Sequence, residues 1–251
     1  MTVAGTGTEL CSYLSWDSEF FNKRIARVTH TKLSEPQVRE LLAWCDENKI
    51  DCLYWLAESD DNMARMAVQY GFEEIDVRLT FERQVDRETF SELPDWRIRP
   101  AVEADIPALR QMASVLHHDT RFYFDKHFDR SQCDRLYETW IEKSCKGWAQ
   151  AVFVVGANEE LAGYISCHLE KAQTANKETM IGLLGVAEAH TGKGLGSALV
   201  RKFLAWSAEL RAERATVVTQ GRNLAARRLY QRCGFKLFSS QVWFHRWFTT
   251  E

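Results

Sequence analysis

IGLLGVAEAHTGKGLGSALVRKFL, residues 181–204, joins an apolar segment to an amphipathic one through a loop that contains Gly192, Gly194 and Gly196. Glycines let a backbone turn tightly and expose its N–H groups, and a following helix N-terminus adds further donors, so this segment predicts an anion site suited to a pyrophosphate. The glycine spacing is neither the GxGxxG of dinucleotide-binding folds nor the pattern of a P-loop. From this segment alone, a strand-to-helix connection without a ligand remains the alternative.

A second informative segment is GRNLAARRLYQRCGF, residues 221–235. Asn223 is a favourable helix N-cap, whose side chain bonds either the helix amides or a ligand. Tyr230 follows two turns further along the predicted helix. Its hydroxyl, with a pKa of about 10 when unperturbed, suits a general acid that keeps its proton at neutral pH and gives it to a thiolate. The alternative for a single helical tyrosine is packing in the core.

The residues around these two segments predict a mixed α/β layer with a central sheet. Strands of residues 151–157 and 161–172 are expected to pair as a hairpin. Glu103 and Asp105 introduce a helix. The other expected elements are strands at 96–101, 181–186, 215–221 and 242–248, and helices at 135–145, 197–211 and 223–233.

The first part of the chain resembles the last. Residues 51–83 align with residues 214–246, and both read as strand, polar turn, helix, Gly-Phe and strand. Gly71 aligns with Gly234, which fits a helix C-cap, but Ala67 stands where the later copy has Tyr230. Because a polar turn at 92–96 separates the copies, we predict domains at 1–94 and 95–251, the first a smaller relative without the chemistry. Chance similarity of two βαβ units is the alternative.

Composition limits the classes of function. A net charge of −3 and a pI near 6.2 argue against a nucleic-acid partner. We expect a cytoplasmic protein without a membrane partner, because the first residues lack a signal-peptide pattern and no apolar run approaches a membrane span. The seven cysteines have no metal-site spacing, and neither does the histidine cluster His117, His118 and His127, so no metal is expected.

The glycine loop followed by Asn223, Tyr230 and Gly234-Phe235 resembles the GNAT acetyltransferase superfamily over residues 96–248. The resemblance implies a GNAT fold with a mixed sheet, acetyl-CoA as the cosubstrate, and Tyr230 as the acid that protonates the leaving sulfur. Thr191 departs from the Arg or Gln that is usual in the loop. The positions that inherit contacts to CoA are Leu184, Gly185, Val186, Lys193, Gly194, Leu195, Gly196, Ser197 and Asn223.

Three further segments, residues 14–28, 120–128 and 137–145, resemble the dTDP-fucosamine acetyltransferases, which acetylate the 4-amino group of a dTDP-linked deoxysugar. In the segment TRFYFDKHF, residues 120–128, Arg121 is suited to a phosphate, and Tyr123 to the face of a sugar or base. Asp125 completes the candidate set for the substrate. Packing of these aromatic residues in the core is the alternative.

The resemblance implies direct transfer, in which an amine attacks the thioester and a backbone N–H of residues 181–186 polarises its carbonyl. The base that takes the proton of the amine is left open among Glu170, Glu188 and His168. Other acceptors stay open as well, namely an amino acid, a polyamine or a protein N-terminus, as does a binding module that senses acyl-CoA without catalysis. The oligomeric state is undetermined, and a homodimer is one option.

Overall fold

The computed structural model describes residues 9–86, 97–157, 160–170 and 177–248. Contacts group the chain into two compact units. The first combines residues 1–78 with 124–128 and 240–251, and the second combines residues 79–123 with 129–239. The predicted domain boundary between residues 94 and 95 lies outside the described residues, so that division stays a prediction.

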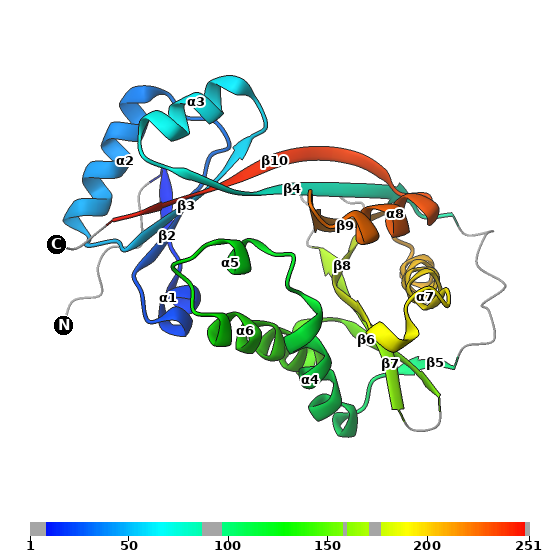
Figure 1. Cartoon of the computed structure of the whole chain (residues 1–251). Coiled ribbons are helices and arrows are strands. Elements are labelled where there is room, and N and C mark those ends of the chain that lie inside the picture. The colour runs from blue at the N-terminus through cyan, green and yellow to red at the C-terminus, as the bar shows by residue number, and fades with distance from the viewer. Residues whose placement is uncertain (1–8, 87–96, 158–159, 171–176, 249–251) are drawn as a thin grey trace. The chain divides into compact units, whose positions relative to one another are not determined.

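The second unit contains a mixed sheet, as predicted (Figure 1). Strands β5 to β8 pair antiparallel in chain order, whereas β8 pairs parallel with β9. The hairpin of β6 and β7 was predicted, and it is confirmed. The strands are β5 (Ile98–Pro100), β6 (Ala151–Ala157), β7 (Glu160–Glu170), β8 (Glu178–Val186) and β9 (Arg214–Gln220), and β4 (Glu73–Gln84) lies beside β9.

Helix α6 (Arg130–Lys143) begins where a side chain satisfies its free amides. Asp129 accepts hydrogen bonds from the amides of Ser131 and Gln132 at the start of α6, which therefore begins earlier than predicted. The helical elements are η1 (Glu103–Asp105), α4 (Ile106–Leu116), α5 (Arg121–Phe124), α6 (Arg130–Lys143), η2 (Ser144–Trp148), η3 (Glu188–His190), α7 (Leu195–Glu209) and α8 (Leu224–Arg232).

The first unit contains strands β1, β2, β3 and the second half of β10, which are neighbours in that order. Strands β2 and β3 are parallel, and the second half of β10 pairs antiparallel with β3. Trp55 and Phe72 lie in its core, with their ring centroids 5.6 Å apart. Its elements are β1 (Cys11–Tyr13), α1 (Ser15–Phe21), β2 (Ile25–Val28), α2 (Glu35–Glu47), β3 (Cys52–Glu58) and α3 (Asp61–Gln69), with β10 (Lys236–Trp247) shared between the units.

The internal repeat extends to the details of the backbone. Helices α3 and α8 have nine residues each, and strands β4 and β10 have twelve each. In both copies a glycine with positive φ ends the helix, at Gly71 with 77° and at Gly234 with 81°. The next amide bonds back to the helix in the same way, from Phe72 to the carbonyl of Ala67 at 2.9 Å and from Phe235 to that of Tyr230 at 3.0 Å. The geometry therefore supports the alignment of the two segments.

Candidate functional site

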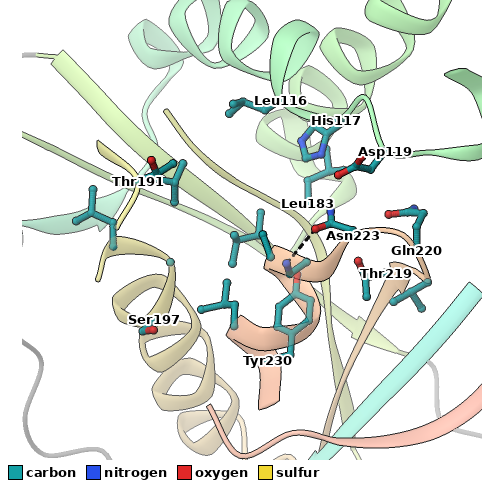
Figure 2. Close-up of a pocket in the computed structure, with 18 of the residues that line it drawn as sticks. Leu116, His117, Asp119, Leu183, Thr191, Ser197, Thr219, Gln220, Asn223 and Tyr230 are labelled. Carbon is teal, nitrogen blue, oxygen red and sulfur yellow. Dashed lines mark hydrogen bonds between the residues drawn. The ribbon is translucent and has the colours of Figure 1, made fainter. Parts of the chain in front are cut away.

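The site begins where two parallel strands separate. Strands β8 and β9 pair from Glu178 and Arg214 up to Ile181 and Val217. Beyond these pairs, β8 continues to Val186 with its β7 partner only. A pocket of ≈ 760 Å³ opens there, lined by the ends of both strands, the glycine loop, and helices α4, α6, α7 and α8 (Figure 2).

The pairing of β8 with β7 decides which of its amides face the separation. The amide of Ala187 donates to the carbonyl of Ala162 at 2.9 Å, which makes this antiparallel pair a hydrogen-bonded one. Because such pairs alternate, the amide of Gly185 points toward β7, while those of Leu184 and Val186 point away from it. Two backbone donors of β8 are therefore turned toward the side on which β9 has diverged.

A β-bulge adjoins these donors. The register of β7 against β8 shifts between Ile165 and Cys167. At the shift, the amide of Leu183 donates to Ser166 Oγ at 2.8 Å, so a buried hydroxyl replaces a strand carbonyl as its acceptor. The Leu183 amide is thus used within the sheet, and the free donors are those further along β8.

The glycine loop forms the next part of the pocket wall. Gly192 and Gly194 have φ values of 75° and 81°, and an added Cβ at either position would meet nothing within 4 Å, so conformation rather than space requires glycine. Gly194 is the N-cap of α7 and has no side chain to bond its first amides. A Cβ at Gly196 would lie 3.1 Å from Leu229, so this glycine allows α7 to approach α8. The helix start therefore presents amides suited to an anion.

Helix α8 supplies the predicted acid. Asn223 caps the helix by accepting from the amide of Ala226 at 2.9 Å. Tyr230 is buried against Phe81 and Phe235, with ring centroids 6.3 and 6.1 Å away, yet it lines the pocket. Burial, and to a lesser extent Cys233, raises the pKa of Tyr230 well above its usual value. The phenol keeps its proton at neutral pH, and its hydroxyl forms no hydrogen bond with another described residue.

His117 lies at the opposite end of the pocket, where it follows α4 (Figure 2). Its ring stacks on Tyr137 at 4.9 Å, and its Nε2 lies 2.6 Å from Tyr164 Oη. Burial lowers the pKa of His117 to about 4, with a smaller contribution from His118, so the imidazole is neutral at pH 7. The phenol of Tyr164 donates to Nε2, because accepting instead would leave its buried hydrogen without a partner among the described residues.

Glycine is required at position 185 for a structural reason. Tyr164 pairs with it across β7 and β8, and a Cβ at Gly185 would lie 2.8 Å from both Tyr164 Cε1 and Leu116 Cδ1. The missing side chain lets the Tyr164 ring cross β8 and reach His117. The glycine of the IGLLGV segment thus acts through Tyr164, since it does not itself line the pocket.

Most of the predicted CoA positions come together in this pocket, and two do not. Lys193 is exposed outside the lining, with Nζ 3.4 Å from His190 Nδ1, and Gly185 is turned toward β7. The predicted residues that line the pocket are Leu184, Val186, Gly194, Leu195, Gly196, Ser197, Asn223 and Tyr230.

The predicted substrate residues lie elsewhere, and their role stays a prediction. Arg121 lies over the ring of Phe122, and the Tyr123 hydroxyl donates to Asp134. Asp125 belongs to the first unit, is 3% exposed, and accepts from His245 Nδ1 at 2.6 Å. These three residues do not line the pocket.

The end of the pocket at His117 was missed by the sequence reasoning. The candidate bases Glu170, Glu188 and His168 are not among its lining residues, whereas His117 and Asp119 are. The sequence signal was available, because VLHHDT follows a predicted amphipathic helix and polar residues after a helix end often line a site.

No group of three or more His, Cys, Asp or Glu side chains in the described residues is arranged to hold a metal ion. Among the same residues, none of the helices combines the length and the apolar character that crossing a bilayer requires.

Comparisons with known proteins agree with this geometry. A model of the acetyltransferase (GNAT) family matches residues 112–235. The dTDP-fucosamine acetyltransferase of Escherichia coli O6:H1 (strain CFT073) is 28% identical over 238 residues, covering 93% of this chain and 96% of the relative. The spore coat polysaccharide biosynthesis protein SpsD of Bacillus subtilis is 24% identical over 154 residues, 61% of this chain and 52% of that protein.

A solved structure shares the fold. The crystal structure of a GCN5-related N-acetyltransferase from Sphaerobacter thermophilus superposes with a TM-score of 0.64 at 14% identity, covering 94% of this chain and 76% of that one. At such identity the likeness concerns the fold alone. Together with the family match, this likeness agrees with the separated strands, the glycine loop and Tyr230: the chain carries an acetyltransferase (GNAT) domain over residues 112–235, and it is an N-acetyltransferase.

Proposed function

We propose that the protein transfers the acetyl group of acetyl-CoA directly to a primary amine, the 4-amino group of a dTDP-linked amino-deoxysugar. One observation carries the reaction. Tyr230 is buried and protonated, and its hydroxyl bonds no other described residue. It lines the same pocket as the free amides of β8 and the start of α7.

The cosubstrate has a place along one wall. The amides from Lys193 to Ser197, at the uncapped start of α7, hold the pyrophosphate of CoA. The amides of Leu184 and Val186 face the separation of the strands, where an extended pantetheine arm adds to the edge of β8. One of these two donors polarises the thioester carbonyl as negative charge develops on its oxygen.

Tyr230 completes the transfer. The amine nitrogen forms a bond to the carbonyl carbon, the bond from carbon to sulfur breaks, and the phenol gives its proton to the departing thiolate. A high pKa suits this role, because the group must hold its proton until the sulfur becomes basic. The phenolate then regains a proton from the nitrogen that became acidic on acylation.

The acceptor end favours a sugar. Tyr137 and Trp140 supply aromatic surface, and Thr219 and Gln220 supply polar groups. Aromatic faces pack against the apolar face of a sugar ring while polar groups bond its hydroxyls. The name of the E. coli relative, which this chain covers almost entirely, supports the same substrate class.

The test is mass spectrometry of the purified protein with acetyl-CoA and a panel of acceptors. The panel contains dTDP-4-amino-4,6-dideoxygalactose and its 4-epimer, with amino acids, polyamines and peptide N-termini as rivals. We expect an added acetyl group on a dTDP-amino sugar and release of one thiol per product. Preferential acetylation of another amine would overturn the proposed substrate, and absence of turnover with every amine would favour a binding module.

A further inference from the structure

Asp119 is an unused carboxylate in the pocket of the second unit. Among the described residues that line this pocket, Asp119 is the only acidic residue. Its side chain is exposed, and within the described part of the chain it forms no hydrogen bond or ion pair. A structural carboxylate is ordinarily held by donors, as Asp105 is by Arg99 at 2.7 Å. Asp119 therefore keeps its full capacity to accept hydrogen bonds from a ligand.

The neighbours of Asp119 leave its charge uncompensated. His117 lines the same end of the pocket, and because burial lowers its pKa to about 4 it carries no positive charge at pH 7 (Figure 2). The cationic lining residue Arg232 lies at the far end of α8, and His190 lies before the glycine loop. The acceptor end thus presents one negative charge, which attracts an ammonium group.

Thr120, the next residue, adds a second polar group. It lines the pocket and is 8% exposed, and its Oγ1 has no hydrogen-bond partner among the described residues. A buried hydroxyl without a partner costs free energy unless a ligand or water satisfies it. Asp119 and Thr120 thus present two adjacent oxygen groups whose hydrogen-bonding capacity the protein does not use. They indicate where an acetyl acceptor that carries several hydrogen-bond donors binds.

We propose that Asp119 recognises the amino group of the acceptor and receives the proton that this group must lose before it attacks. This inference rests on the proposed function, since it assigns the amine end of the same site. The nearby neutral imidazole of His117, fixed by Tyr164 Oη at 2.6 Å, gives the amine an uncharged neighbour that does not repel it.

The proton balance follows from the reaction. An ammonium group has three hydrogens on nitrogen, and the amide product keeps one. Asp119 takes the first proton, which frees the lone pair that attacks the carbonyl carbon, and passes it to water. The second proton returns to the Tyr230 phenolate after the phenol has protonated the thiolate. The net reaction releases one proton to solvent for each acetyl group transferred.

The experiment compares Asp119→Asn, Asp119→Glu and the control Glu138→Gln with wild type. Glu138 is a carboxylate of α6 that pairs with Arg110 at 3.0 Å and does not line the pocket. The acceptor is dTDP-4-amino-4,6-dideoxygalactose, and the competing probe is the dTDP sugar with a hydroxyl in place of the amine. Initial rates, the Kd of CoA and the melting temperature are measured for each protein.

Asp119→Asn should lower kcat/KM for the amino sugar by about 10- to 100-fold, because the Asn oxygen still accepts a hydrogen bond but carries no charge and cannot take the proton. Its CoA affinity and melting temperature should stay at the wild-type values, as should all parameters of Glu138→Gln. Wild type should bind the amino sugar more tightly than the hydroxyl probe, and this preference should vanish in Asp119→Asn and return in Asp119→Glu.

An Asn variant with wild-type kcat/KM and an unchanged preference for the amine would overturn the assignment of Asp119. An equal loss of affinity for both sugars would also overturn it, because a merely structural role predicts that result. Failure of the proposed function gives a different outcome, since wild type itself would then acetylate none of the dTDP-amino sugars.

Discussion

Replacing Tyr230 by Phe tests the chemistry most directly, because the change removes one oxygen and keeps the ring. The hydroxyl bonds no described residue, so its removal leaves no protein group without a partner. The contacts of the ring with Phe81 and Phe235 persist. We therefore expect unfolding free energy to change by less than about 0.5 kcal/mol, the usual range for substitutions that remove no partner. CoA affinity should likewise be unchanged.

Turnover of Tyr230→Phe should fall by about a hundredfold, the scale of a general-acid contribution, which corresponds to about 2.7 kcal/mol in activation free energy. Free thiol and acetylated product are followed together at saturating acetyl-CoA. Because burial raises the pKa of Tyr230, the wild-type rate should show no loss from phenol ionisation below about pH 10. A folded Phe variant with wild-type turnover would mean that water protonates the thiolate, and Tyr230 would lose its role.

Gly194→Val should abolish CoA binding in calorimetry, because φ is 81° at the helix start, and unchanged affinity would exclude the loop as the pyrophosphate site. One CoA should bind per chain, because in the first unit the buried side chain of Trp55 stands at the position that aligns with the pocket-lining Val218. Binding of two equivalents of CoA with similar affinity would refute this prediction. Burial opposes ionisation of Asp125, but hydrogen bonds, first from His245, prevail and keep its pKa below the usual range. That stabilisation is present above about pH 4 and is lost as pH falls toward the folded pKa of Asp125. Asp125→Asn should therefore lower the unfolding free energy, measured in urea, by about 3 kcal/mol at pH 7 and by less near pH 3. An equal loss at both pH values would contradict this prediction.

Local sequence signals were sufficient where the chemistry is local. The glycine loop, Asn223 and Tyr230 could be predicted because φ, capping and helix spacing depend on neighbours along the chain. Strand β10 begins at Lys236, before the predicted residue 242. The early start could not be read from the sequence, because the first half of the strand is exposed and its apolar residues do not alternate with polar ones. Asp125 is a candidate for the substrate because it lies in the segment 120–128, and its donors His245 and Trp247 come from far along the chain.

The contacts at the His117 end of the pocket could not be predicted either, because they join residues on different elements. The partner of His117 is Tyr164 on another element, and the stacking partner is Tyr137 on a third. The contact with Tyr164 depends on the absence of a side chain at Gly185, which in the sequence alone reads as part of a strand. The direction of the Leu184 amide depends equally on the pairing of β8, which no local pattern encodes.

The two copies of the internal repeat share a backbone frame and differ at the positions that the proposed chemistry uses. The two copies share a capping residue at the helix start, Asp60 or Asn223, and the same glycine geometry at the helix end. Within that common frame, the first copy has Ala67 where the second has Tyr230, and a buried indole where the second has a small pocket-lining valine. Backbone geometry alone therefore does not make the site. The proposed chemistry requires a phenol at one helical position, and the proposed place of the thioester requires that no large side chain fills the gap between the strands.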